Sequence, residues 1–178
     1  MNAQQDQRLS QDTQAAFRDA MRRFASSVTI ITTCDDGRRR GMTATAVTSV
    51  CMQPPSLLMC INRYASMHQA LDRSRLACVN FLHAHQAELC SIFSGPLDAE
   101  QRFMHGTWQT GALGLPFLPE AQASVFVRLK AQLPIGTHDI FVGEVIDAHV
   151  NHQVAPLLYL DGTTLPLERP WPTAVRRR

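Results

Sequence analysis

The sequence predicts a mainly β protein, in which antiparallel strands close into a barrel and the helices between them are short. Short β-branched or alternating segments, about seven in all, recur along the chain at the spacing of hairpins. The helical patterns between these segments are too short for the crossovers of a parallel sheet. Hydrophobic residues make up 45% and charged residues 18% of the 178 residues, which excludes a disordered chain and suits one domain.

The first third of the chain predicts one helix and three strands. After a polar stretch at 1–13, apolar residues at helical spacing predict a helix over 13–24. β-branched residues predict a strand at 27–33, which is followed by a polar turn that contains three arginines. The segment 41–50 is interpreted as one strand, and 56–61 as a buried strand after a Pro-Pro pair.

The middle of the chain predicts short helices around one strand. Ser66 begins a helix, and Gln69 three residues later fits a capping box. Segment 76–82 is predicted as a strand. Segment 86–93 is predicted as a helix that a Gly-Pro pair ends, and 98–103 adds a helical turn.

The last third predicts a loop followed by strands. Glycine and proline break up 107–120, which we interpret as a loop. Residues 123–133 alternate between apolar and polar, and Pro134 is predicted to end this strand. Segment 140–150 is another strand, and 157–167 has the pattern of a hairpin around Asp-Gly.

Composition places this single domain at residues 14–167, between polar tails at 1–13 and 168–178. Apolar runs fall short of the ~20 residues of a membrane span, and the polar start is no secretion signal. Five cysteines without a CxxC pair indicate free thiols in a reducing cytoplasm. A net charge of +2 gives no reason to expect nucleic acid.

Two segments have the residue types of a ligand site. The strand 41–50, GMTATAVTSV, contains small and hydroxyl side chains that let a flat ligand approach the backbone, and packing beneath a helix explains it equally well. The segment from Asn62 to Ser66 leaves a strand and enters a helix, where free N–H groups and Arg63 suit a phosphate. The alternative for this segment is an ordinary capped helix.

Several separated segments together carry a family resemblance. GMTATAVTSV, PPSLLMCIN, CVNFL, QRF, WQTG and GTHDIF follow one another in this order. The chain resembles, over residues 17–167, the short-chain NAD(P)H:flavin oxidoreductases, which are the reductase components of two-component flavin monooxygenases. Within that family it looks most similar to the FMN reductase of pyrimidine utilisation and the reductase of 4-hydroxyphenylacetate hydroxylase.

The resemblance implies a split antiparallel β-barrel that forms a homodimer with FMN near the subunit interface. The implied activity is the reduction of free FMN, or of FAD, by NADH or NADPH. The reduced flavin would diffuse to a separate monooxygenase. A related alternative is a flavin-binding oxidoreductase with another acceptor, such as ferric iron.

The resemblance also implies site residues, and no metal among them. His138, in the Gly-Thr-His motif, is the catalytic residue, and we assign it to positioning the nicotinamide before any proton transfer. Hydride transfer from nicotinamide to flavin is a positioning task that needs no protein nucleophile. The implied cofactor-binding residues are Thr43, Ala44, Thr45, Ala46, Ser49, Val50, Cys51, Asn62, Ser66, Asn80, Phe81 and Arg102.

Other classes of function have weaker signals. Cys78, His83, His85 and Cys90 gather metal-ligating side chains, but their spacing matches no common zinc pattern, so a zinc module remains an alternative. The arginine runs lack interleaved aromatic residues, which favours solvated charge over a nucleic-acid site. No GxSxG elbow of a hydrolase and no GxGxxG of a Rossmann site is present.

Overall fold

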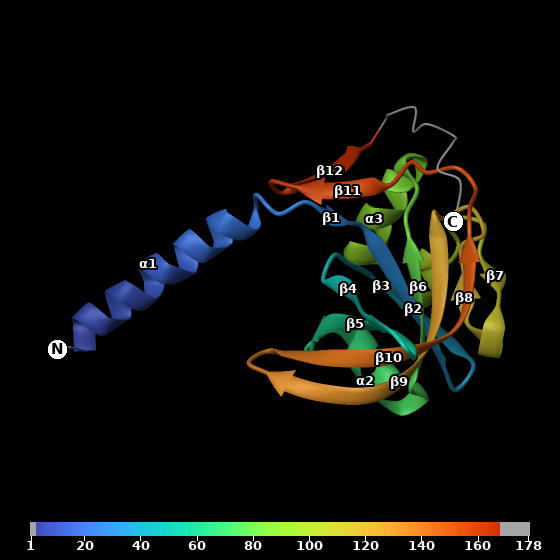
Figure 1. The fold of residues 1–178 in the computed structure, drawn as a ribbon, viewed down its shortest axis with the longest axis horizontal. Coiled ribbons are helices and arrows are strands. Elements are labelled where there is room, and N and C mark those ends of the chain that lie inside the picture. Colours follow the sequence, from blue (N-terminus) through green and yellow to red (C-terminus); the bar gives the residue numbers. More distant parts are fainter. Residues whose placement is uncertain (1–2, 168–178) are drawn as a thin grey trace.

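The structure is a computed structural model that describes residues 3–167, and it confirms the predicted fold class (Figure 1). Antiparallel strands contain more of the described residues than the helices do, and every helix after the first is short. The helices are α1 (Ala3–Met21), α2 (Ser66–Ser74), α3 (Ala87–Ser94) and α4 (Ala99–Arg102), with 3₁₀ turns at Ala84–Gln86 and Ala112–Gly114. The strands are β1 (Ser26–Ser27), β2 (Thr29–Asp35), β3 (Arg38–Ala44), β4 (Val47–Met52), β5 (Pro55–Asn62), β6 (Leu76–Phe81), β7 (Gln109–Thr110), β8 (Pro116–Phe117), β9 (Ala123–Ile135), β10 (His138–Val150), β11 (Leu157–Leu160) and β12 (Thr163–Pro166).

One seven-stranded sheet forms the body of the protein. Its strands run in the order β3-β2-β6-β9-β10-β5-β4, and each neighbouring pair is antiparallel. A three-stranded sheet of β1, β11 and β12 and the two-stranded pair β7–β8 lie beside it. The long central strands β9 and β10 form the hairpin that projects from the body in Figure 1.

The segment 41–50 is two strands and not one, so that prediction is wrong. Residues up to Ala44 belong to β3 and residues from Val47 belong to β4. β3 and β4 are the two edge strands of the large sheet, and only Thr45 and Ala46 join them. This corner curls the sheet, because it connects one edge covalently to the other.

Other element boundaries also differ from the prediction. α1 begins at Ala3 and ends at Met21, so the polar start of the chain is helical too. The arginines predicted in a turn lie in β3, where Arg38 pairs with Asp35. β9 continues past Pro134 to Ile135, because the proline pairs with β10 near the end of the hairpin.

Helix α2 packs against the concave side of the curled sheet. Its residues Met67 and Leu71 are fully buried with Met59, Ile61 and Phe141 of the strands. Burial of an aliphatic side chain of this size contributes about 1.5–3 kcal/mol. The helix is therefore held to the sheet by its apolar face, and its first residues are fixed beside the end of β5.

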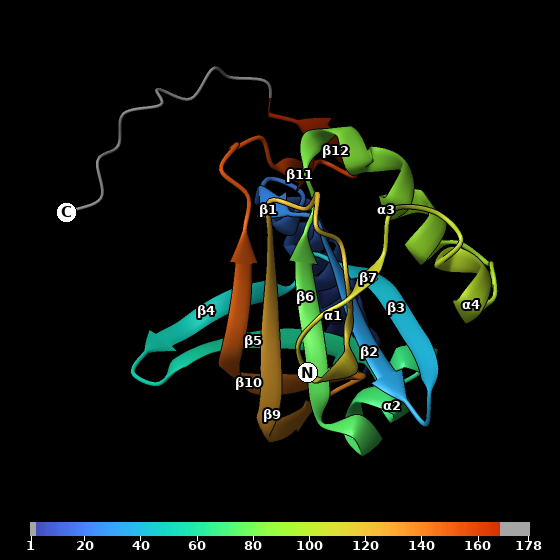
Figure 2. The same cartoon turned by 90° about the vertical axis from the view of Figure 1, so that its right-hand side faces the viewer.

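Helices α3 and α4 cover an outer side of the sheet next to β3 (Figure 2). Phe93 and Phe103 are buried there, and their rings meet at right angles with centroids 5.3 Å apart. Trp108 packs on both rings, so it is half-buried and not a free loop residue. Gly41 of β3 fits beneath this cluster because a Cβ there would lie 2.6 Å from the Phe93 ring.

Helix α1 projects away from the body and leaves its apolar stripe exposed (Figure 1). Phe17 and Met21 lie four residues apart on one face of the helix, Phe24 follows in the turn after it, and all three are exposed. At the end of the helix, Arg22 forms an ion pair of 3.0 Å with Asp161 in the β11–β12 turn. Among the described residues, no helix is long and apolar enough to span a membrane.

Candidate functional site

The neighbouring strands β10, β5 and β4 share an outer face that carries several of the predicted site residues. His138 lies opposite Asn62, and the Ala46 carbonyl accepts a hydrogen bond of 3.0 Å from the Cys60 N–H. Because cross-strand partners point to the same side, Ala46, Asn62 and His138 lie at one end of this face. We call this surface the site face, and its residues are Ala46, Thr48, Leu58, Cys60, Asn62, His138, Ile140 and Val142.

The site face is accessible, whereas the alternate residues of β5 and of the first half of β10 are buried. Ala46 and His138 are both exposed, and Cys60 and Asn62 are half-buried. The hydroxyl of Thr137 lies 2.9 Å from Nδ1 of His138 and steadies the ring at the start of β10. The small side chain of Ala46 and the exposed imidazole of His138 therefore lie on the same face, on either side of β5, which leaves room for a flat ligand between them.

The start of α2 lies beside the same end of the site face. Asn62 Oδ1 accepts a hydrogen bond of 2.9 Å from the Tyr64 N–H, and the chain then enters the helix after Ala65. Ser66 is exposed and is the first helical residue, so the predicted capping box is wrong. The His68 N–H donates to the Ala65 carbonyl at 2.9 Å, whereas Ala65 offers no side-chain cap to the N–H groups of Ser66 and Met67, which can therefore face an anion.

Ser49, Val50 and Cys51 lie further along β4. A bulge interrupts the pairing between Ser49 and Cys51, and all three residues are exposed. Cys51 lies opposite Ser56, near the β4–β5 turn, which places this group away from the end occupied by His138. The structure thus distributes the predicted residues of β4 along the strand.

Ala44, Thr45 and Phe81 border the corner from the other side. Ala44 and Phe81 flank Thr29 in one row across β3, β2 and β6, and both pack against the buried interior. Thr45 follows directly at the corner and is half-buried. These residues support the corner where β3 ends and β4 begins.

Three predicted cofactor residues have their polar atoms committed elsewhere. The amide of Asn80 is completely buried, and its oxygen accepts from the Leu118 N–H at 3.0 Å and the Ser124 hydroxyl at 2.9 Å. Thr43 donates to a carbonyl of α3 at 2.8 Å. The structure does not bring either side chain to the site face. Arg102 instead donates to the carbonyl oxygens of Gly41, Phe93, Gly95 and Leu97.

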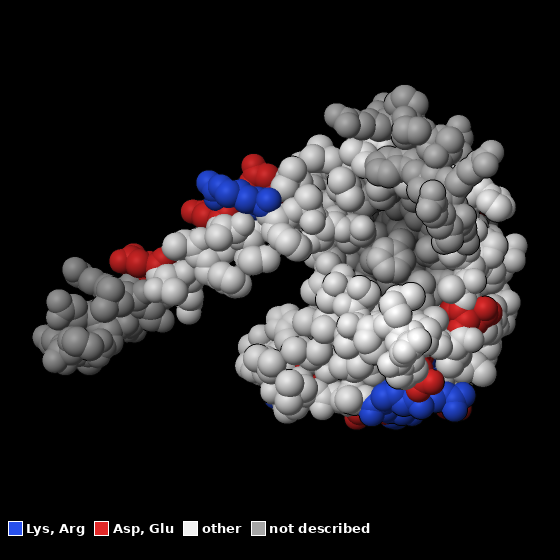
Figure 3. Space-filling model, viewed as in Figure 1, with Lys and Arg blue, Asp and Glu red and all other residues white. Residues whose placement is uncertain are grey.

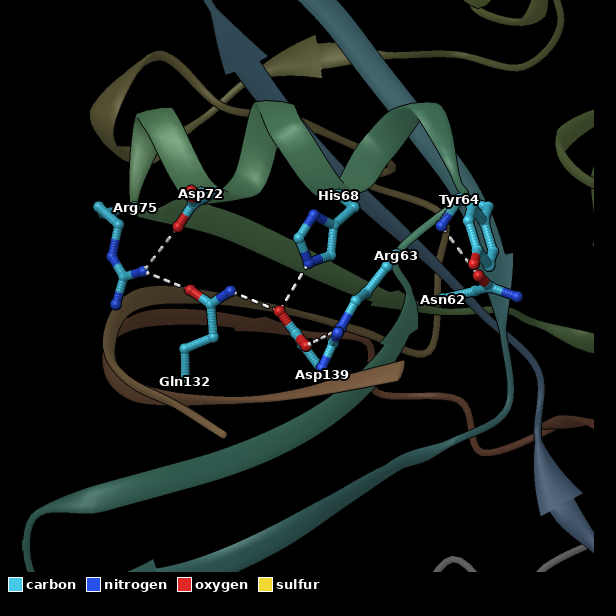
Figure 4. Close-up of polar contacts among 8 residues, drawn as sticks. All are labelled: Asn62, Arg63, Tyr64, His68, Asp72, Arg75, Gln132 and Asp139. Carbon is cyan, nitrogen blue, oxygen red and sulfur yellow. Dashed lines mark hydrogen bonds and ion pairs between the residues drawn. The ribbon is translucent and has the colours of Figure 1, made fainter. Parts of the chain in front are cut away.

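A buried carboxylate, which the sequence analysis did not single out, lies just behind the site face (Figure 4). Asp139 accepts hydrogen bonds from Arg63 Nε at 2.6 Å, His68 Nε2 at 2.8 Å and Gln132 Nε2 at 2.6 Å. Its side chain is only 6% exposed. The bonds from Gln132, His68 and Arg63 lower the pKa of the Asp139 carboxyl, so it stays ionised at neutral pH.

The four residues of the zinc alternative do not assemble a metal site. Within the part of the chain that the structure describes, no three metal-ligating side chains gather around a common point. Cys78 is fully buried, and this burial raises the pKa of its thiol, so it behaves as a small apolar residue. His83 and His85 contact each other through their Nδ1 atoms at 2.7 Å.

Comparison with known proteins decides the family to which this chain belongs. The profile of a family described as "Flavin reductase like domain" matches residues 21–168. This chain belongs to the flavin reductase like family. The family predicted from the sequence motifs is therefore confirmed.

Named relatives of this flavin reductase like chain agree with the assignment. It is 46% identical over 145 residues to the reductase component of FADH(2)-dependent resorcinol hydroxylase of Rhizobium sp. strain MTP-10005, covering 80% of this chain and 81% of that protein. It is 43% identical over 141 residues to the FMN reductase (NADH) RutF of Pseudomonas syringae, covering 79% and 78%. The solved structure of BorF, the flavin reductase component of a bacterial two-component tryptophan halogenase, is 30% identical with a TM-score of 0.79, covering 86% and 98%.

Proposed function

We propose that this protein is an NAD(P)H:flavin oxidoreductase that reduces free FMN and releases it for a separate monooxygenase. The observation that carries the proposal is the match of nearly the whole chain to the flavin reductase like family. The site face supports it, because Ala46, Asn62 and His138 share the end of this face that lies beside the start of α2.

The residues at the corner fit an isoalloxazine ring. Ala46 presents only a methyl group, so a planar ring can approach the backbone of the β3–β4 corner closely. The N–H groups of Ser66 and Met67, to which Ala65 offers no side-chain cap, suit the phosphate of FMN, and the helix dipole adds to the attraction. Arg63 is half-exposed in the same segment and supplies positive charge near that phosphate.

We propose that His138 orients the nicotinamide. Bound flavin accepts a hydride from nicotinamide C4, so the protein must hold the nicotinamide ring stacked on the isoalloxazine ring in the orientation that allows transfer. His138 is exposed on the site face, opposite Asn62, where a second ring stacked on the flavin would lie. Its imidazole offers a hydrogen bond to the carboxamide of the nicotinamide.

The sequence favours release of the reduced flavin. Its five cysteines lack the CxxC and CxxCH spacings of paired redox thiols and haem attachment. Electrons on the flavin therefore leave with it, pass to oxygen, or pass to a partner protein. Two of the relatives are named as components of two-protein systems, which supports a diffusible product and a separate monooxygenase.

FMN with NADH is the proposed pair, and FAD and NADPH are the alternatives. RutF of Pseudomonas syringae is named an FMN reductase (NADH), whereas the resorcinol hydroxylase is named FADH(2)-dependent. A phosphate site at the start of α2 serves either flavin. We also propose that residues 14–167 form one domain, since the family profile matches residues 21–168. The five unpaired cysteines favour a location in the cytoplasm.

Purified protein tests this function directly. NADH oxidation is expected to be slow without flavin and to rise saturably as FMN is added. NADPH and FAD are compared in parallel to rank the alternatives. A preparation that binds FMN and yet oxidises neither nucleotide would contradict the proposed activity.

We further propose a homodimer that covers the site face. Leu133 and Ile135 lie opposite Ile140 and His138, so they extend this face onto β9, and they are 57% and 55% exposed. In Figure 3 the hairpin that carries them shows few charged residues on the side toward α1. Exposed apolar surface of this kind marks a protein interface.

A double charge substitution tests the dimer. Wild-type protein is expected to show twice the 19.8 kDa subunit mass in light scattering at micromolar concentration. Leu133→Glu with Ile135→Glu should shift it to the subunit mass, because charge at the centre of an interface is costly. Val154→Glu, in an exposed loop, is the control. An active wild-type monomer, or a double variant that stays dimeric, would refute this interface.

A further inference from the structure

We propose that Asp139 is a positioning residue that holds His138 and the start of α2 in fixed relation to each other. The inference rests on the proposed function, because it names the residue that fixes the proposed nicotinamide group, His138, relative to the proposed phosphate site at the start of α2. Asp139 itself points away from the site face and is buried. It therefore acts through the residues that it binds and not by touching a ligand.

The carboxylate ties the segment before α2 to the β9–β10 turn. Arg63 Nε donates to Asp139 Oδ1 at 2.6 Å, and the Arg63 N–H donates to the Thr137 carbonyl at 3.0 Å. The first contact fixes the side chain and the second fixes the backbone. The residues on either side, Asn62 and His138, are cross-strand partners at the site face.

The second carboxylate oxygen reaches helix α2 and strand β9. Oδ2 accepts from His68 Nε2 at 2.8 Å and from Gln132 Nε2 at 2.6 Å. Arg75, at the other end of α2, donates to Gln132 Oε1 at 3.0 Å (Figure 4). One buried charge thus connects both ends of α2 with the hairpin that carries His138.

The contacts require two acceptor oxygens. Three donors from three different segments converge on Asp139, and a carboxylate accepts all of them. An asparagine keeps one acceptor oxygen and turns an NH₂ group toward a donor. Asp139→Asn therefore leaves at least one of the three donors without its acceptor, while the shape of the side chain is conserved. The expected result is loosening of the turn at His138 relative to Ser66.

The test compares Asp139→Asn with a control that perturbs a different buried polar group. Thr33 is fully buried on β2 and donates to the Leu76 carbonyl at 2.7 Å, outside the site. The thermal unfolding midpoint of each variant is measured, and the assays are done at temperatures well below it. Asp139→Asn is expected to lower kcat/KM for NADH about five-fold and to weaken FMN binding, whereas Thr33→Val keeps both values near wild type.

The ring resonances of His138 give a readout that needs no activity. In wild type and in Thr33→Val they should be single and sharp, whereas in Asp139→Asn they should broaden or split as the turn samples several positions. A wild type that is inactive refutes the proposed function, and the His138 resonances still test the role of Asp139. Unchanged resonances in Asp139→Asn, or no greater kinetic loss than in Thr33→Val, would overturn the inference.

Discussion

Replacement of Ala46 by tryptophan is expected to weaken FMN binding by about ten- to hundred-fold, or ~1.4–2.8 kcal/mol, which lies within the range found for an overpacked site. Ala46 lies at the corner between the two edge strands and is exposed, so a larger side chain does not disturb the core. Its indole would occupy the space above the backbone where the isoalloxazine ring is proposed to lie.

Titration of FMN fluorescence measures this effect. Ala148→Trp is the matched control, because Ala148 is also an exposed strand residue and lies outside the proposed site. Thermal unfolding establishes that both variants remain folded. If Ala46→Trp binds FMN as tightly as wild type, the flavin does not lie at the β3–β4 corner.

Replacement of His138 by alanine is expected to lower kcat/KM for NADH by roughly ten-fold or more, equivalent to ~1.4 kcal/mol of transition-state stabilisation. His138 is exposed on the site face and stands opposite Asn62. Loss of the imidazole removes a group that orients the nicotinamide, while the surfaces proposed to hold the flavin remain. The dissociation constant of FMN should therefore change little.

Steady-state kinetics at saturating FMN measure the effect. His149→Ala is the control, since His149 is an exposed histidine near the other end of β10. Equal kinetics for His138→Ala and wild type would remove His138 from the nicotinamide site. A large loss of FMN affinity in His138→Ala would instead assign this residue to the flavin.

Local sequence patterns predicted the fold class because hairpins depend on local alternation and turn residues. The strand break at Thr45 and Ala46 was missed, since small and β-branched residues continue through it without a proline or glycine. The bend arises because β3 pairs with β2 and β4 pairs with β5, and these two hairpins lie at opposite edges of the same sheet. Similarly, Pro134 does not end β9, because Pro134 and Ile135 still pair with Asp139 and His138 of β10.

Some of the candidate site residues could likewise be predicted from local motifs, and others could not. Ala46, Asn62 and His138 were predicted from motifs, and the structure brings them to one end of the site face. Asn80 appeared in a motif too, but its hydrogen bonds to segments far along the chain give it a buried structural place. Asp139 directly follows His138, and only the folded chain shows the three donors that surround it.

The most direct test of the account is anaerobic reduction of FMN in large excess over the protein by NADH, followed by the visible absorbance of oxidised flavin. The proposed function predicts that a trace of protein bleaches the whole FMN pool and consumes one NADH for each flavin. Two results would contradict it. Bleaching that stops at one flavin for each subunit would show that reduced flavin is retained, and no bleaching would show that the chain does not transfer hydride to flavin.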